Sequence, residues 1–73
     1  MTGGLEIHMS LKEILKLCDR QMYVHIFNND YYDGLIEYNT VDRILNNNFS
    51  YLNKKVIKIE IYEDELWVNV KGV

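Results

Sequence analysis

The last quarter of the chain constrains the fold most, because it alternates apolar and polar residues on both sides of a short acidic turn. Residues 55–71 read KVIKIEIYEDELWVNVK. A period of two is typical of strands with one buried face, and two such runs around a tight turn predict an antiparallel hairpin. We expect Ile61 to lie opposite Leu66 in this hairpin. The expected buried face then holds Ile57, Ile59, Ile61, Leu66, Val68 and Val70.

Two helices are predicted upstream of the hairpin. Ser10 and Glu13 have the spacing of a capping box, and apolar residues at intervals of three and four predict a helix over residues 11–20. A second helix, capped by Thr40 or Asn39, ends at the three asparagines 46–48. Asparagine tolerates the left-handed conformation that is found at helix C-termini.

Two further strands are predicted between the helices. Residues 22–27 alternate, and a second strand lies within residues 32–39. For that strand we favour a parity with Ile36 and Tyr38 inward and Glu37 outward. The first strand should bury its aliphatic set, which is Met22, Val24 and Ile26.

The order αββαββ predicts an α+β fold, with both helices on one face of a four-stranded, mainly antiparallel sheet. A chain of 73 residues makes one domain with one core. Residues 1–8 are typical of a vector-derived leader joined at a cloning site, so that a native start at Met1 and one at Met9 both stay open. The single domain is expected to cover residues 9–73.

The sheet face without helices should carry an unusual number of aromatic rings. These rings either shield one another and the sheet backbone, or form a surface for a protein partner or a second copy of the chain. Base stacking on a single nucleic-acid strand is a third interpretation, which acidic neighbours weaken. The predicted partner-binding residues are Trp67, Tyr62, Tyr23, His25, Glu60, Glu63, Asp64 and Glu65.

The charge balance favours a protein partner over nucleic acid. Eleven acidic residues stand against eight basic ones, which gives a formal net charge of -3. A protein that binds phosphate backbones needs a clustered basic face. The acids gather around the last turn and within residues 30–42, where they form either solvated turns or a docking surface for a basic partner. A homodimer is the alternative.

No residue pattern indicates catalysis, and we predict a non-enzymatic protein with no catalytic residue, metal or cofactor. Cys18, His8 and His25 are too few for a zinc site. A nucleophilic pair of Cys18 and His25 lacks a supporting acid or oxyanion motif. The single cysteine cannot form an internal disulfide, which indicates the cytoplasm of a bacterial host. No apolar run approaches the length of a membrane span, so we expect no membrane association.

Four segments carry a resemblance to known proteins, and they are SLKEIL, YVHIF, TVDRIL and KKVIKIEIYEDELWV. From Met9 onward the chain resembles small uncharacterised proteins of Gram-positive phages and mobile elements. Small acidic inhibitors of host defence nucleases, the anti-CRISPR proteins, are a recurring type among them. The resemblance therefore implies a phage or mobile-element protein that blocks a defence complex. It transfers no motif residue.

Overall fold

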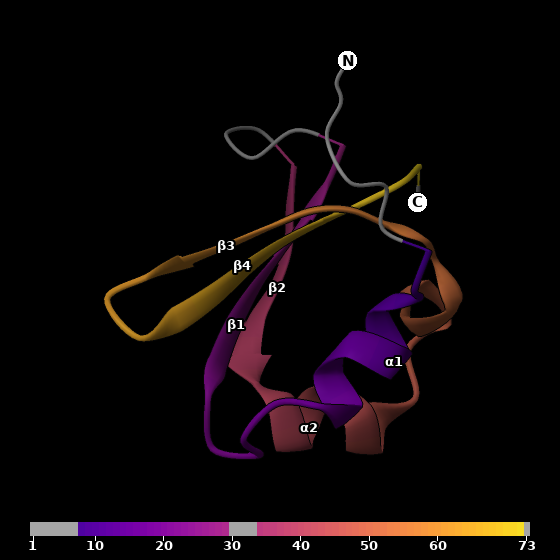
Figure 1. The fold of residues 1–73 in the computed structure, drawn as a ribbon. Helices are drawn as coiled ribbons and strands as arrows, with labels where there is room; N and C mark the ends of the chain where they lie inside the picture. Colours follow the sequence, from indigo (N-terminus) through magenta and orange to yellow (C-terminus); the bar gives the residue numbers. More distant parts are fainter. Residues whose placement is uncertain (1–7, 30–33, 73) are drawn as a thin grey trace.

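The computed structural model describes residues 8–29 and 34–72, and the expected α+β fold with the order αββαββ is confirmed. Residues 1–7 of the predicted leader lie outside the described residues, as do Asp30 and Asp33. The elements in chain order are helix α1 (Leu11–Lys16), strands β1 (Tyr23–Asn28) and β2 (Leu35–Thr40), helix α2 (Val41–Asn47), the 3-10 turn η1 (Ser50–Asn53), and strands β3 (Val56–Tyr62) and β4 (Glu65–Val70) (Figure 1).

The four strands form one sheet in the order β2-β1-β4-β3. Strands β1 and β2 pair antiparallel, as do β3 and β4, but β1 and β4 pair parallel in the middle. The expectation of a mainly antiparallel sheet is therefore wrong, and the sheet is mixed. The reason is the connection through α2 and η1, which carries the chain from one edge of the sheet to the other. Strand β4 then returns to the centre beside β1.

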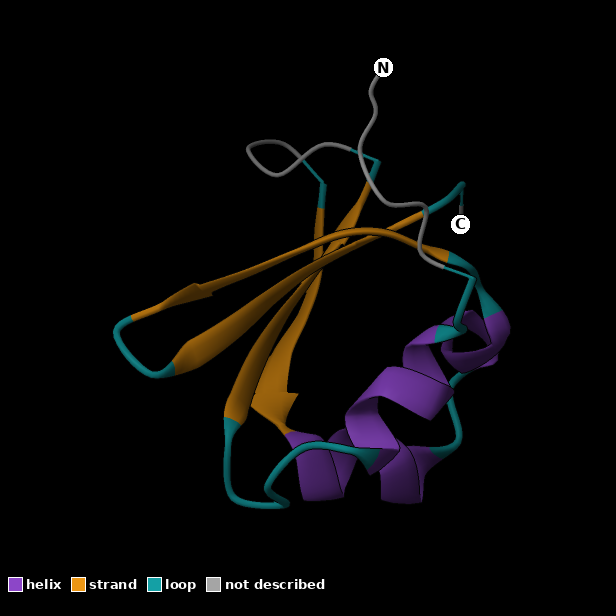
Figure 2. Cartoon of the chain, in the orientation of Figure 1, coloured by secondary structure: helices purple, strands orange, loops and turns teal. Residues whose placement is uncertain are grey.

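Both helices lie on one side of the sheet (Figure 2). Ser10 caps α1 through a reciprocal capping box with Glu13, as its sequence pattern predicts. Thr40, one of the two expected caps, caps α2. Helix α1 ends four residues earlier than expected, at Lys16. The fully buried side chains of the core are Leu11, Leu15, Val24, Ile26, Val41, Ile44, Leu52, Val56, Val68 and Val70. In the described ranges 8–29 and 34–72, no helix has the length and apolarity to cross a membrane.

Strand β3 departs from the expected alternation at its start. Val56 pairs with Val70 and Lys58 with Asn69, so Ile57 is the extra residue of a β-bulge. Val56 is buried in its place, and Ile57 is 48% exposed. The predicted inward position of Ile57 is wrong, because one extra residue moves a side chain to the other face.

The end of the hairpin follows the predicted register but not the predicted burial. Ile61 pairs with Leu66 as expected, and Leu66, Val68 and Val70 are buried. Ile59 is partly buried and packs against the core. Ile61 lies on the helix side of the sheet, yet it is 64% exposed. The hairpin end extends away from the helices (Figure 1), so this isoleucine is left beyond the core.

Strand β2 has the opposite parity to the predicted one over most of its length. Tyr38 pairs with His25, away from the helices, and Glu37 pairs with the buried Ile26. The predicted directions of Tyr38 and Glu37 are therefore wrong, whereas Ile36 packs against the core as expected. A register shift between Ile26 and Phe27 separates these positions. The bulge again explains the change of face.

Candidate binding surface

The face of the sheet opposite the helices is called the open face here. Alternation along each strand brings every second residue to this face. The parallel pairing of β1 and β4 sets His25 directly beside Trp67 and Phe27 beside Asn69. The antiparallel pairings add Tyr38 next to His25 on one side, and Glu60 next to Trp67 on the other.

Five rings form a continuous row across all four strands, which we call the aromatic column. The ring centroids of Tyr23 and Tyr38 are 5.2 Å apart, and those of Tyr38 and His25 are 4.3 Å apart. His25 then stacks on Trp67 at 4.4 Å, and the edge of Tyr62 meets Trp67 at 5.3 Å. Such offset and edge-on arrangements are the favourable geometries for aromatic pairs.

The column is closed in the middle and accessible at its tyrosines. The two central rings, His25 and Trp67, are only partly exposed. Phe27, which lies beside the column and stacks on Trp67 at 5.3 Å, is only 4% exposed. Tyr23, Tyr38 and Tyr62 are each between 44% and 49% exposed. Mutual shielding therefore accounts for the central rings. The tyrosines still present ring surface to a second molecule.

A carboxylate fixes the centre of the column. Glu65 Oε1 lies 2.7 Å from His25 Nε2, and Glu65 Oε2 accepts a hydrogen bond from Tyr38 Oη at 3.1 Å. The bond to His25 and the bond to Tyr38 lower the pKa of Glu65, against the effect of burial. The same carboxylate raises the pKa of Tyr38. Glu65 is thus engaged within the chain and orients two rings.

The turn between β3 and β4, together with its flanking residues 60–65, is called the hairpin tip. Glu63 and Asp64 occupy the turn with φ of 49° and 66°. Positive φ at both central residues belongs to the type I′ turn, which matches the twist of a two-residue hairpin. Both side chains are exposed. Glu60 differs, because it accepts a hydrogen bond from Tyr62 Oη at 2.9 Å and lies 3.9 Å from Lys58 Nζ.

The structure brings the eight predicted binding residues to one region. Two of them form the turn, Glu63 and Asp64, and the others lie on the open face. Sequence reasoning missed Tyr38, because its parity was assigned without the bulge, and it missed Ile61 as an exposed residue of the tip. Hydrophobicity offered no signal for either residue, since isoleucine is usually buried and tyrosine occurs both in cores and at surfaces.

The second acidic region does not form a comparable surface among the described residues. Asp42 pairs with Arg20, whose Nη1 lies 2.9 Å from Asp42 Oδ1. Glu37 lies on the helix side of the sheet, where it accepts a hydrogen bond from Asn39 at 3.3 Å. Asp42 and Glu37 therefore have partners within the chain.

The histidine and the cysteine do not meet. Cys18 packs against the core on the helix side, where its Sγ donates to the carbonyl of Ile14 at 3.4 Å, and burial raises the pKa of the thiol. His25 lies on the open face. Residues 8–29 and 34–72 contain no group of three side chains that could hold a metal ion.

No protein-family model matches the sequence, and neither the curated proteins nor the solved structures contain a match.

Proposed function

We propose that the chain is a non-enzymatic protein-binding module that contacts a basic partner through the hairpin tip and the adjoining tyrosines of the aromatic column. The observation that carries the proposal is the composition of the tip. Its two exposed apolar residues, Ile61 and Tyr62, lie among the four carboxylates Glu60, Glu63, Asp64 and Glu65. Ile61 faces the helix side and Tyr62 the open face, so each face of the tip combines one exposed apolar side chain with neighbouring carboxylates. Apolar contacts with a polar rim are the usual anatomy of a protein interface.

The position of the tip favours contact with another molecule. The end of the β3–β4 hairpin extends away from the helices, so a partner can approach it from several sides (Figure 1). Its negative charge would accelerate encounter with a basic surface and disfavour acidic ones. Tyrosine is also enriched among the residues that dominate interface energies, and Tyr62 adjoins the charged turn.

A host defence nuclease complex is the partner class that we propose, in the cytoplasm of a bacterium that harbours the phage or mobile element. Nucleases bind nucleic acid through clustered Lys and Arg side chains. The acidic hairpin tip would offer carboxylates to these Lys and Arg side chains in place of the phosphates of nucleic acid. The resemblance of the segments SLKEIL, YVHIF and TVDRIL to phage proteins supports the same class.

The test compares two variants of equal net charge. Glu63→Asn with Asp64→Asn removes two negative charges from the tip, and asparagine keeps the positive φ accessible. The control adds two positive charges at exposed positions of α2 and η1, with Asn46→Lys and Asn53→Lys. Both variants should fold like the native chain.

Each protein is used to capture partners from bacterial lysate, and the captured protein is then purified and titrated at several salt concentrations. We expect a basic protein to bind the native chain and the control, to bind the tip variant at least about tenfold more weakly, and to lose affinity as salt rises. Equal binding by both variants, or binding that ignores salt, would contradict the proposal.

A homodimer is the second candidate, and strand β3 favours it. This strand is an edge of the sheet, and it exposes Ile57 and Ile61. An edge strand with apolar side chains is a template for pairing with another chain. Sedimentation at several concentrations separates the candidates, since a concentration-dependent dimer that Ile57→Lys abolishes would support self-association.

A further inference from the structure

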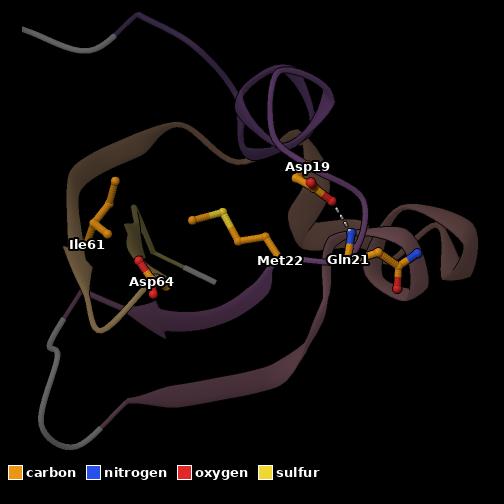
Figure 3. Close-up of a pocket in the computed structure, with 5 residues that line it drawn as sticks. All are labelled: Asp19, Gln21, Met22, Ile61 and Asp64. Atoms are coloured by element: carbon orange, nitrogen blue, oxygen red, sulfur yellow. Dashed lines mark hydrogen bonds between the residues drawn. The ribbon is translucent and has the colours of Figure 1, made fainter.

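An open groove of about 490 Å³ lies between the connection from α1 to β1 and the hairpin tip. Its lining residues are Asp19, Gln21, Met22, Ile61 and Asp64. Figure 3 shows Met22 between Asp19 and Gln21 on one side and Ile61 and Asp64 on the other. The parallel pairing of β1 with β4 creates this proximity, because the residues that precede two parallel strands emerge at the same end of the sheet.

The groove combines an apolar floor with carboxylates at both ends. Met22 and Ile61 supply the floor, and Ile61 is among the most exposed large apolar residues of the described chain. Asp19 is fixed by a 2.7 Å hydrogen bond that its Oδ1 accepts from the backbone N–H of Gln21. No hydrogen bond or ion pair joins the Asp64 carboxylate to another described residue. The described lining contains no Lys, Arg or His.

This chemistry is complementary to one kind of side chain, with a long aliphatic stem and a cationic head. Arginine fits better than lysine, because its guanidinium is less strongly hydrated and can donate two parallel hydrogen bonds to one carboxylate. The methylene groups would cover Met22 and Ile61 while the head reaches a carboxylate at the rim.

We propose that this groove receives an arginine side chain of the protein partner, with Asp64 as the principal carboxylate. The proposal rests on the proposed function for the existence of that partner, and it adds the residue type that the partner inserts. It also extends the contact around the tip, since the groove lies on the helix side of the sheet and the aromatic column on the open face.

The test uses the full chain and two short blocked peptides that differ in one atom group. Acetyl-Gly-Arg-Gly-amide carries the guanidinium, and the peptide with citrulline in place of arginine has the same shape without the charge. Methyl signals of Met22 and Ile61 in isotope-labelled protein report on the floor of the groove. We expect the arginine peptide to shift both signals along one saturable curve, with binding that weakens as salt rises. The citrulline peptide should shift them little at the same concentration.

Matched variants locate the carboxylate. Asp64→Asn should weaken binding of the arginine peptide about threefold to fivefold, the upper part of the range for one exposed ion pair. Glu63→Asn is the control, because Glu63 occupies the neighbouring turn position with the same left-handed backbone but does not line the groove. It should leave the affinity unchanged within about twofold, as expected for a charge that makes no direct contact.

Several results would overturn the inference. Equal shifts with arginine and citrulline, equal loss in the two variants, or shifts confined to the Trp67 indole would each do so. Shifts that grow with protein concentration alone, with dimers in sedimentation, would assign the groove to a second copy of the chain and also refute it. A failed peptide titration together with intact partner capture refutes only the groove, whereas failed capture of a basic partner refutes the proposed function.

Discussion

Replacing Trp67 by alanine tests whether the aromatic column supports the fold as well as the surface. The indole stacks on His25 and Phe27 and meets the edge of Tyr62. Aromatic pairs contribute about 0.5–1.5 kcal/mol each beyond the area they bury. Three such contacts and the loss of a half-buried indole place the cost of Trp67→Ala at roughly 3 kcal/mol, the lower end of the range for Trp→Ala in cores.

That cost is large for a domain of this size. At about 0.05–0.15 kcal/mol per residue, 73 residues correspond to a free energy of unfolding of roughly 4–11 kcal/mol. We therefore expect the Trp67→Ala variant to be folded at low temperature but to melt at a much lower temperature than the native chain. Urea unfolding followed by far-ultraviolet circular dichroism measures the loss, because this variant has no tryptophan fluorescence.

Two controls sharpen the result. Trp67→Phe keeps a ring in the stack and should lose less stability than the alanine variant. Tyr62→Ala removes a half-exposed ring at the end of the column and should cost about 1 kcal/mol or less, so it is the better probe of binding. A loss below about 1 kcal/mol for Trp67→Ala would refute the argument that the stack stabilises the sheet.

Four further substitutions test other parts of the structure. Ile59→Asp should unfold the domain, because Ile59 packs against the core. Ile57→Asp should be tolerated, because Ile57 is exposed at the bulge. Thermal melting of both variants tests the position of the bulge. Tyr51→Phe should keep or raise the free energy of unfolding by about 1 kcal/mol, because the buried hydroxyl has no hydrogen-bond partner among the described residues. Burial raises the pKa of Tyr51 from 10.0 to about 12, so the tyrosine ionises at a lower pH in the unfolded chain than in the folded one. The free energy of unfolding is therefore unaffected by this group below pH 10.0 and falls as the pH rises toward 12. Urea unfolding at alkaline pH should show a smaller loss in the phenylalanine variant than in the native chain. The lowered pKa of Glu65 gives the opposite sign: its contribution is present above the ordinary pKa of 4.5 and is lost as the pH falls through the folded value. Glu65→Gln should reduce the fall in the free energy of unfolding at acidic pH. An unchanged dependence on pH in this variant would count against the contact with His25.

Local patterns in the sequence predicted the elements because each depends on nearby residues. Ser10 and Glu13 determine where α1 begins, and the alternation around residues 63–64 determines the hairpin and its register. The open face was predicted for the same reason, since a period of two separates Trp67 from Leu66 regardless of the neighbouring strand.

Long-range pairing and bulges were beyond the same reasoning. The order of strands in the sheet leaves their buried faces unchanged, so no local pattern reveals that β1 lies beside β4. A bulge adds one residue without an obligatory sequence signature, and each bulge here reversed a prediction, at Ile57 and at Tyr38. The groove could not be predicted either, because Met22 and Asp64 come to line it together only through the pairing of β1 with β4.

The aromatic column and the groove both depend on the parallel pairing of β1 with β4, and nuclear Overhauser contacts test this pairing directly. We expect strong contacts between the ring of His25 and the indole of Trp67, with further contacts between Val24 and Leu66 and between Ile26 and Val68. Contacts that pair Val24 with Val68 or Val70 instead, or the absence of any contact between the His25 and Trp67 rings, would contradict it.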